Sequence, residues 1–290
     1  MRMSYYPGCS MGSIAVSYAK SLLAVAEALG LRLEEIPDWN CCGASIASGV
    51  AGGFVQQVLV ARNLALAEEM KQDVLVACSS CYLNLATTNS RLQQDSLYAG
   101  RVNKALAVGG LHYSGSVRVR RAIDVMLGEI GPERIESRVQ VPLKGLKVAG
   151  YLGCQTMRAH PGEFDQAESP KGLDRLIKAL GAESVNFTRQ TTCCGSSHVV
   201  PASEVVTRQV KEILASAVEG GADIIVTLCP LCQLNLETHQ EKVNEIFGTD
   251  YEIPVLFFTQ LMAYAFGLPS NTWGFEHMLI SPKMPAPASA

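Results

Sequence analysis

The side chains best suited to chemistry in this sequence are its ten cysteines, which fall into two sets with one pattern. Each set has a single cysteine, then a Cys-Cys-Gly triplet, then a Cys-x-x-Cys pair. The first set is Cys9, Cys41, Cys42, Cys78 and Cys81, and the second is Cys154, Cys193, Cys194, Cys229 and Cys232. No cysteine lies outside the pattern, and the segments CYLNLAT (81–87) and CQLNLET (232–238) also correspond. We interpret the chain as an internal duplication with one five-thiol site in each half.

Five thiols in one site favour a soft group that contains several metal ions. Iron–sulfur clusters are bound by cysteine thiolates and fit this description. Structural zinc takes four ligands and would leave one cysteine over, although zinc in one of the two sites stays open. A thioredoxin-like dithiol would explain only the Cys-x-x-Cys pairs. The spacing does not decide between five cluster ligands and four ligands plus one reactive thiol.

The composition of the chain and the absence of nucleotide-binding motifs limit the functions that it can have. A formal net charge of −3 provides no basic surface for nucleic acid. The most apolar window, IPVLFFTQLMAYAFGL (253–268), is too short and too interrupted to span a bilayer, so we expect a cytoplasmic protein without a transmembrane segment. Neither G-x-G-x-x-G nor G-x-x-x-x-G-K-[ST] occurs. We therefore expect no flavin or nucleotide in this chain and a partner as the source of electrons.

The elements that must position the cysteines alternate between apolar strands and helices. Helical spacing covers 13–29, 53–71, 171–180 and 202–219, and short apolar strands precede the cysteines. This alternation predicts an α/β protein built from two Rossmann-like, doubly wound parallel-sheet halves, with cysteine loops at the carboxyl ends of the strands. The expected organisation is a first half over 1–100, a linking segment over 101–145, a second half over 146–268 and a C-terminal tail over 269–290.

Three residues near the second cysteine set, and one basic segment, are further candidates. His198 and His160 could donate a proton or a hydrogen bond beside a bound group, and Arg158 could hold an anionic part of a substrate. The segment SVRVRRAIDVMLGEI (116–130) is predicted to form an amphipathic helix. Its arginines at 118, 120 and 121 are expected to form a solvated face.

The motifs PGCS, DWNCCGAS and ACSSCYLNL, followed by GCQTMR, CCGSS and CPLCQLNL, resemble the cysteine-rich CCG-domain family. Within it, the sequence is most similar to the catalytic B subunit of heterodisulfide reductase and its bacterial homologues, over roughly residues 3–266. The resemblance implies that each five-cysteine set binds a non-cubane [4Fe–4S] cluster. It also implies a disulfide substrate between the two clusters, whose cleavage sends one sulfur to an iron of each. Implied partners are a ferredoxin-like C subunit and a flavin-containing A subunit.

The sequence departs from the family pattern beside both single cysteines, at GCSMGS and at GCQTMRAHPGE. Both departures lie beside cysteine loops that would adjoin the substrate. We therefore do not infer which disulfide this chain acts on from the substrate of the family. One alternative is an electron-transfer or quinone-side subunit of a succinate dehydrogenase-type complex. A second alternative is a non-catalytic, metal-bound scaffold.

Overall fold

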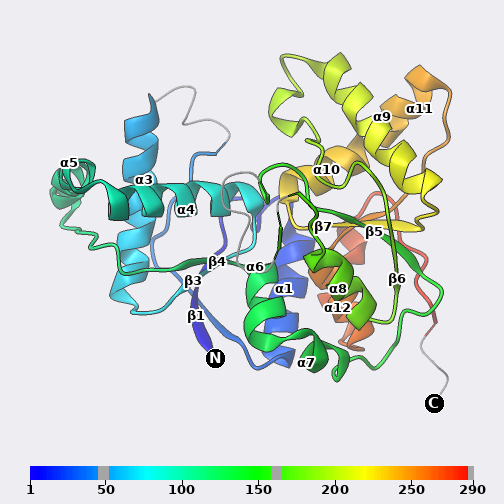
Figure 1. The fold of residues 1–290 in the computed structure, drawn as a ribbon, viewed down its shortest axis with the longest axis horizontal. Helices are drawn as coiled ribbons and strands as arrows, with labels where there is room; N and C mark the ends of the chain where they lie inside the picture. Colours follow the sequence, from blue (N-terminus) through cyan, green and yellow to red (C-terminus); the bar gives the residue numbers. More distant parts are fainter. Residues whose placement is uncertain (45–51, 158–164, 167, 287–290) are drawn as a thin grey trace.

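The computed structural model describes residues 1–44, 52–157, 165–166 and 168–286. Its strands form two four-stranded sheets, ordered β2-β1-β3-β4 and β6-β5-β7-β8. Every neighbouring pair of strands is parallel, and the second sheet repeats the strand order of the first. The expected α/β fold with two doubly wound halves is therefore confirmed. In Figure 1 the first half runs from blue through teal to the green helices α6 and α7, and the second half continues from green to red.

The first half follows the strand–helix alternation that the sequence predicts. Helix α1 ends two residues before Gly30, whose left-handed backbone (φ 72°) is typical of a glycine that follows a helix. The elements, in chain order, are β1 (Arg2–Tyr6), α1 (Val16–Ala28), β2 (Arg32–Glu35), α3 (Gly52–Glu69), β3 (Val74–Val76), α4 (Ser79–Gln94), α5 (Ser96–Leu106), β4 (Val119–Arg121), α6 (Ala122–Val125), a π-helical turn (Met126–Ile130) and α7 (Pro132–Glu136).

The second half repeats this order. Its elements are β5 (Lys147–Tyr151), α8 (Gly172–Ala179), β6 (Glu183–Val185), a 3-10 turn (Ser196–His198), α9 (Ser203–Glu219), β7 (Ile224–Thr227), α10 (Pro230–Thr238), α11 (Gln240–Phe247), β8 (Val255–Phe257) and α12 (Phe258–Ala265). Two 3-10 turns, Ser270–Thr272 and Phe275–His277, follow α12. No helix within the described ranges combines the length and the apolar character needed to cross a bilayer.

The two halves share one hydrophobic core. Side chains of α1, α6, α8 and α12 and of both sheets belong to this common core, whereas α3–α5 and α9–α11 form separate cores on the outer faces. Helices α1 and α12 come from different halves and lie side by side (Figure 1). Tyr18 of α1 stacks on Phe257 at the end of β8 with ring centroids 4.2 Å apart, and Ser21 is hydrogen-bonded to Thr259. Burial of these groups fixes the two halves relative to each other.

The prediction of one amphipathic helix over 116–130 is wrong. Val119–Arg121 forms β4, which pairs with β3 and completes the first sheet, so the segment 101–145 contributes to the first half as well as linking the halves. Arg120 and Arg121 are buried, and only Arg118 is exposed. The arginines of this segment lie on an edge strand and not on a helix. Arg120 and Arg121 can be buried because each one has a carboxylate partner.

The tail packs on its own chain as far as Pro285. The carboxylate of Glu237 on α10 accepts hydrogen bonds from the backbone N–H groups of Leu279 (3.1 Å) and Ile280 (3.2 Å) and from the amide of Gln233 (2.7 Å). The hydroxyl of Tyr264 donates to the carbonyl of Pro285 (2.5 Å). A buried carboxyl group therefore fastens the tail to α10.

This carboxyl group predicts a pH dependence of stability. Burial raises the pKa of Glu237 above its ordinary value, so the folded chain holds this proton more tightly than the unfolded chain. Its contribution to stability is therefore complete below the unfolded pKa and is lost as pH rises through the raised value. In thermal unfolding of the metal-free protein between pH 4 and 8, Glu237→Gln should gain stability relative to the wild type as pH rises. Glu241→Gln, at an exposed carboxylate, is the control, and an identical trend in both variants would contradict the assignment.

Candidate functional site

The cysteines of each set follow the carboxyl ends of three adjacent strands. Cys9 follows β1, the pair Cys41–Cys42 follows β2, and Cys78 follows β3 and caps the amino end of α4. The Sγ atoms of Cys42 and Cys81 are 3.3 Å apart, and those of Cys9 and Cys41 are 3.7 Å apart. Cysteines far apart in the sequence therefore meet at one sheet edge, beside the switch point between β1 and β3.

The second set repeats this arrangement. Cys154 follows β5, the pair Cys193–Cys194 follows β6, and Cys229 follows β7 and caps the amino end of α10. The Sγ atoms of Cys194 and Cys232 are 3.5 Å apart. In both sets the last cysteine of the triplet and both cysteines of the Cys-x-x-Cys pair are buried, and the other two are partly or fully exposed. All ten are free thiols.

The two sets meet at Cys78 and Cys229. Interaction with the Cys229 thiol is the largest cause that lowers the pKa of the Cys78 thiol below its ordinary value, and interaction with Cys78 in turn contributes to the raised pKa of Cys229. Hydrogen bonding with the Cys41 and Cys81 thiols likewise lowers the pKa of Cys42, to about 3. A low pKa favours the thiolate, which is the form of cysteine that binds metal. The innermost cysteines of the two halves are thus in direct contact.

A second layer of residues, which the sequence reasoning missed, positions the cysteine loops identically in both halves. The hydroxyls of Tyr6 and Tyr151, each the last residue of its strand, donate to the carbonyls of the residues just before the Cys-Cys pairs, at 2.8 Å and 2.5 Å. The side-chain amides of Asn84 and Asn235 donate to the carbonyls of Cys42 and Cys194, at 3.0 Å and 2.6 Å. The repeat itself carried the signal, because Tyr-x-Gly-Cys and Cys-x-Leu-Asn occur in both halves.

Glycines adjoin the thiols where a side chain would not fit. Gly8 and Gly153 both have positive φ (70° and 66°), and a Cβ atom there would lie 2.9 Å from the Sγ of Cys81 and 3.1 Å from that of Cys232. After the cysteine pairs, the N–H groups of Gly43 and Gly195 point at the Sγ atoms of Cys41 (3.4 Å) and Cys193 (3.3 Å). Backbone donors of this kind stabilise anionic sulfur.

The donor set and the surrounding space suit a multi-metal group. All five cysteines of the second set line one small pocket that is partly open to solvent: Cys154, Cys193, Cys194, Cys229 and Cys232. Ser79 and Ser80 of the first half line the same pocket, together with Gln155, Ser196 and Ser197. Within the described ranges, no three or more His, Cys, Asp or Glu side chains are arranged to hold a single metal ion. Residues of both halves therefore line the recess beside the second set of thiols.

The other candidates are not assembled with the thiols. His198 is exposed at the end of its 3-10 turn, where its backbone N–H bonds to the carbonyl of Gly195, and it does not line the pocket. His160 and Arg158 lie outside the described residues.

Comparison with known proteins defines the class. The family model described as "Cysteine-rich domain" (CCG) matches residues 3–86 and 148–237, one copy in each half. The chain belongs to this cysteine-rich CCG-domain family, as its motifs predict.

Individual relatives point to two kinds of complex. The chain is 36% identical to the 8-methylmenaquinol:fumarate reductase membrane anchor subunit of Wolinella succinogenes, covering 96% of each chain. It is 33% identical to the B subunit of a ferredoxin/F420H2-dependent CoB-CoM heterodisulfide reductase of Methanosarcina acetivorans, covering 96% of this chain and 94% of that one. Among solved structures, a hypothetical protein from Helicobacter pylori shares the fold, with a TM-score of 0.76 at 16% identity. That match covers 97% of this chain and 52% of the other.

Proposed function

We propose that this chain is an iron–sulfur electron-transfer subunit that reduces, or reversibly forms, a disulfide where its two five-cysteine sites meet. The contact between Cys78 and Cys229 carries the proposal, because it brings the two thiol sets to one place in the molecule. The similarity to the B subunit of a heterodisulfide reductase over nearly the whole chain supports this reaction class.

In this proposal each cysteine set holds one [4Fe–4S] cluster of the non-cubane type. The ligands are Cys9, Cys41, Cys42, Cys78 and Cys81 in the first site and Cys154, Cys193, Cys194, Cys229 and Cys232 in the second. Bound clusters supply electrons one at a time, whereas a disulfide takes up two electrons and two protons to give two thiols. Two neighbouring sites match that requirement. The electrons come from partner subunits, a ferredoxin-like protein and a flavoprotein.

The chain itself supplies polar positioning groups around the second site. Hydroxyls of Ser79, Ser80, Ser196 and Ser197 and the amide of Gln155 line the pocket beside the thiols. Neutral hydroxyl and amide groups can hydrogen-bond to a substrate and orient its sulfur atoms without placing a fixed charge beside them. For His198, His160 and Arg158, a role toward the substrate stays a prediction from the sequence.

A second candidate is a quinone-side subunit of a fumarate reductase or succinate dehydrogenase type of complex. The observation in its favour is the 36% identity to a membrane anchor subunit of an 8-methylmenaquinol:fumarate reductase. The same pair of sites would then transfer electrons between a quinol and a dicarboxylate-reducing partner.

The test begins with protein purified without oxygen. About eight irons and a matching amount of sulfide per chain are expected for two four-iron clusters. The chemically reduced protein should then turn over an added disulfide, whereas activity only with a menaquinol analogue would select the second candidate. Loaded protein that turns over neither would be a scaffold, and zinc without iron or sulfide would overturn the cluster assignment.

A further inference from the structure

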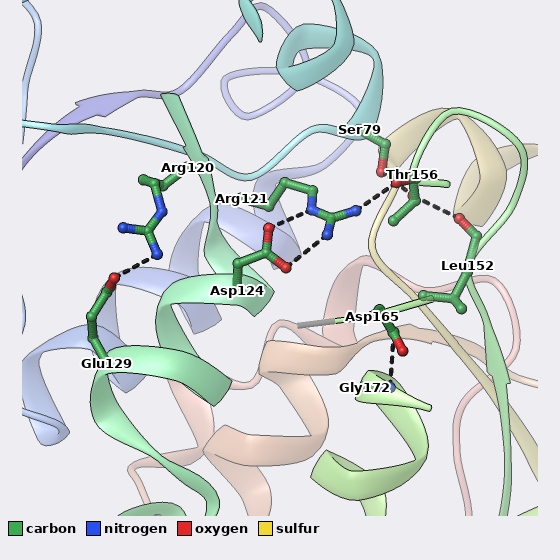
Figure 2. A network of polar contacts seen from close by, with 9 residues as sticks. All are labelled: Ser79, Arg120, Arg121, Asp124, Glu129, Leu152, Thr156, Asp165 and Gly172. Atoms are coloured by element: carbon green, nitrogen blue, oxygen red, sulfur yellow. Dashed lines mark hydrogen bonds and ion pairs between the residues drawn. The ribbon is translucent and has the colours of Figure 1, made fainter. Parts of the chain in front are cut away.

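Arg121 and Asp124 form a buried ion pair at the junction of the two halves. Their side chains are 5% and 8% exposed. The guanidinium binds the carboxylate through two parallel hydrogen bonds, Nε to Oδ2 at 2.7 Å and Nη2 to Oδ1 at 2.8 Å. Figure 2 shows this pair between the first-half strand β4 and the loop that contains Thr156. A buried pair of this geometry is rigid, because both charges depend on one arrangement for their compensation.

The same guanidinium reaches the cysteine loops of both halves. Its Nη1 donates to the backbone carbonyl of Thr156 at 2.5 Å, two residues after Cys154. Its central carbon lies 5.3 Å from the ring centroid of Tyr82, the residue that follows Cys81. Arg121 therefore bridges a ligand loop of the second site and the ligand helix of the first.

Thr156 receives a second contact from the first half. Its Oγ1 donates to the carbonyl of Leu152 at 2.8 Å and lies 2.9 Å from the Oγ of Ser79, between the two cysteines of the first Cys-x-x-Cys pair (Figure 2). Thr156 is 1% exposed, so no solvent replaces these partners if they move. The Cys154 loop is thus tied to β4 through its backbone and to the Cys78–Cys81 turn through a side chain.

We propose that the Arg121–Asp124 pair is a positioning element that fixes the Cys154 loop against the Cys78–Cys81 turn and so sets the spacing of the two thiol sites. The role of the pair in electron transfer rests on the proposed function, but its structural role does not. The asymmetry between the halves supports a specific device, because Pro230 and Leu231 occupy the positions that Ser79 and Ser80 occupy in the first half.

The neighbouring pair Arg120–Glu129 is a matched control. Arg120 precedes Arg121 on β4, is also buried, and its Nη2 lies 2.5 Å from the Glu129 carboxylate on the opposite side of the strand (Figure 2). Arg120→Lys and Arg121→Lys both keep the charge and lose the planar fork, so they carry similar general costs to folding. Only Arg121→Lys removes the guanidinium N–H that donates to the carbonyl of Thr156.

Two measurements test the proposal. In hydrogen exchange of the metal-free protein, the amides of 152–157 should exchange about tenfold faster in Arg121→Lys and less than about twofold faster in Arg120→Lys, as expected for the loss of buried hydrogen bonds. In the loaded protein, the magnetic interaction between the two reduced sites should weaken in Arg121→Lys only. Asp124→Asn replaces the carboxylate that pairs with Arg121 by a neutral amide. This variant should shift both readouts in the same direction as Arg121→Lys.

The outcomes separate this inference from the proposed function. Protein that binds no iron in any variant would reject the proposed function, while the exchange experiment would still decide the positioning role. Equal exchange at 152–157 in both lysine variants, or an unchanged magnetic interaction in Arg121→Lys with both sites loaded, would overturn the inference. If Arg121→Lys does not fold, Ser79→Ala removes the side-chain contact to Thr156 and should accelerate exchange of the same amides.

Discussion

Gly8→Ala is expected to empty the first five-cysteine site and leave the second one loaded. The new Cβ would lie 2.9 Å from the Sγ of Cys81, closer than non-bonded atoms allow, and Cys81 is buried among its neighbours. The positive φ of 70° adds a backbone cost of about 1 kcal/mol for any residue with a side chain. Iron analysis should show about half of the wild-type content, and thermal unfolding should show a lower Tm.

Gly12→Ala is the control for this substitution. Gly12 lies three residues after Cys9, is exposed and does not have a positive φ, and a Cβ added there would meet no heavy atom within 4 Å. Its iron content should equal that of the wild type. Gly153→Ala should empty the second site instead, because its Cβ would lie 3.1 Å from the Sγ of Cys232. Full iron in both Gly8→Ala and Gly153→Ala would show that the sulfurs can move aside, and the assigned ligand positions would then be wrong.

Local chain signals were sufficient to predict the fold. The apolar segment around Val74–Val76 is long enough only for a strand, and Gly30 marks the end of the first helix, α1. Repetition of the cysteine spacing then predicted that one half would copy the other, and both sheets have the same strand order. These features depend on residues close together in the sequence, so they could be predicted without a structure.

The features that join the halves were not predictable in this way. Arg121 looked like part of a solvated helix face because its partners, Asp124 and the carbonyl of Thr156, can be recognised only once β4 is placed in the sheet. The contact between Cys78 and Cys229 likewise depends on the common core that holds the halves together. The periodicity of apolar residues predicts which face of a helix or strand is buried, but it does not predict which residues that face contacts.

The second large effect is expected when one inner cysteine of either site is removed. Cys42→Ala and Cys194→Ala each delete a single buried sulfur and keep the Cβ, so the packing around the site changes little. Each variant should retain about half of the wild-type iron, since the two sites have separate ligands. Disulfide turnover should nevertheless fall by at least ~100-fold in both, because a two-electron reaction then has only one loaded site. Iron analysis and steady-state kinetics on the same preparations measure both quantities.

The double variant shows whether the two sites act as a unit. When two groups act together in one step, removal of either one abolishes nearly all of the rate enhancement that they provide. The rate losses of the two single variants therefore do not multiply in the double variant. Cys42→Ala/Cys194→Ala should therefore be about as slow as either single variant, although it contains almost no iron. Sites that transfer electrons independently would instead give two partial losses whose product appears in the double variant. Because Cys78 and Cys229 place the two sites in contact, the structure favours the first result.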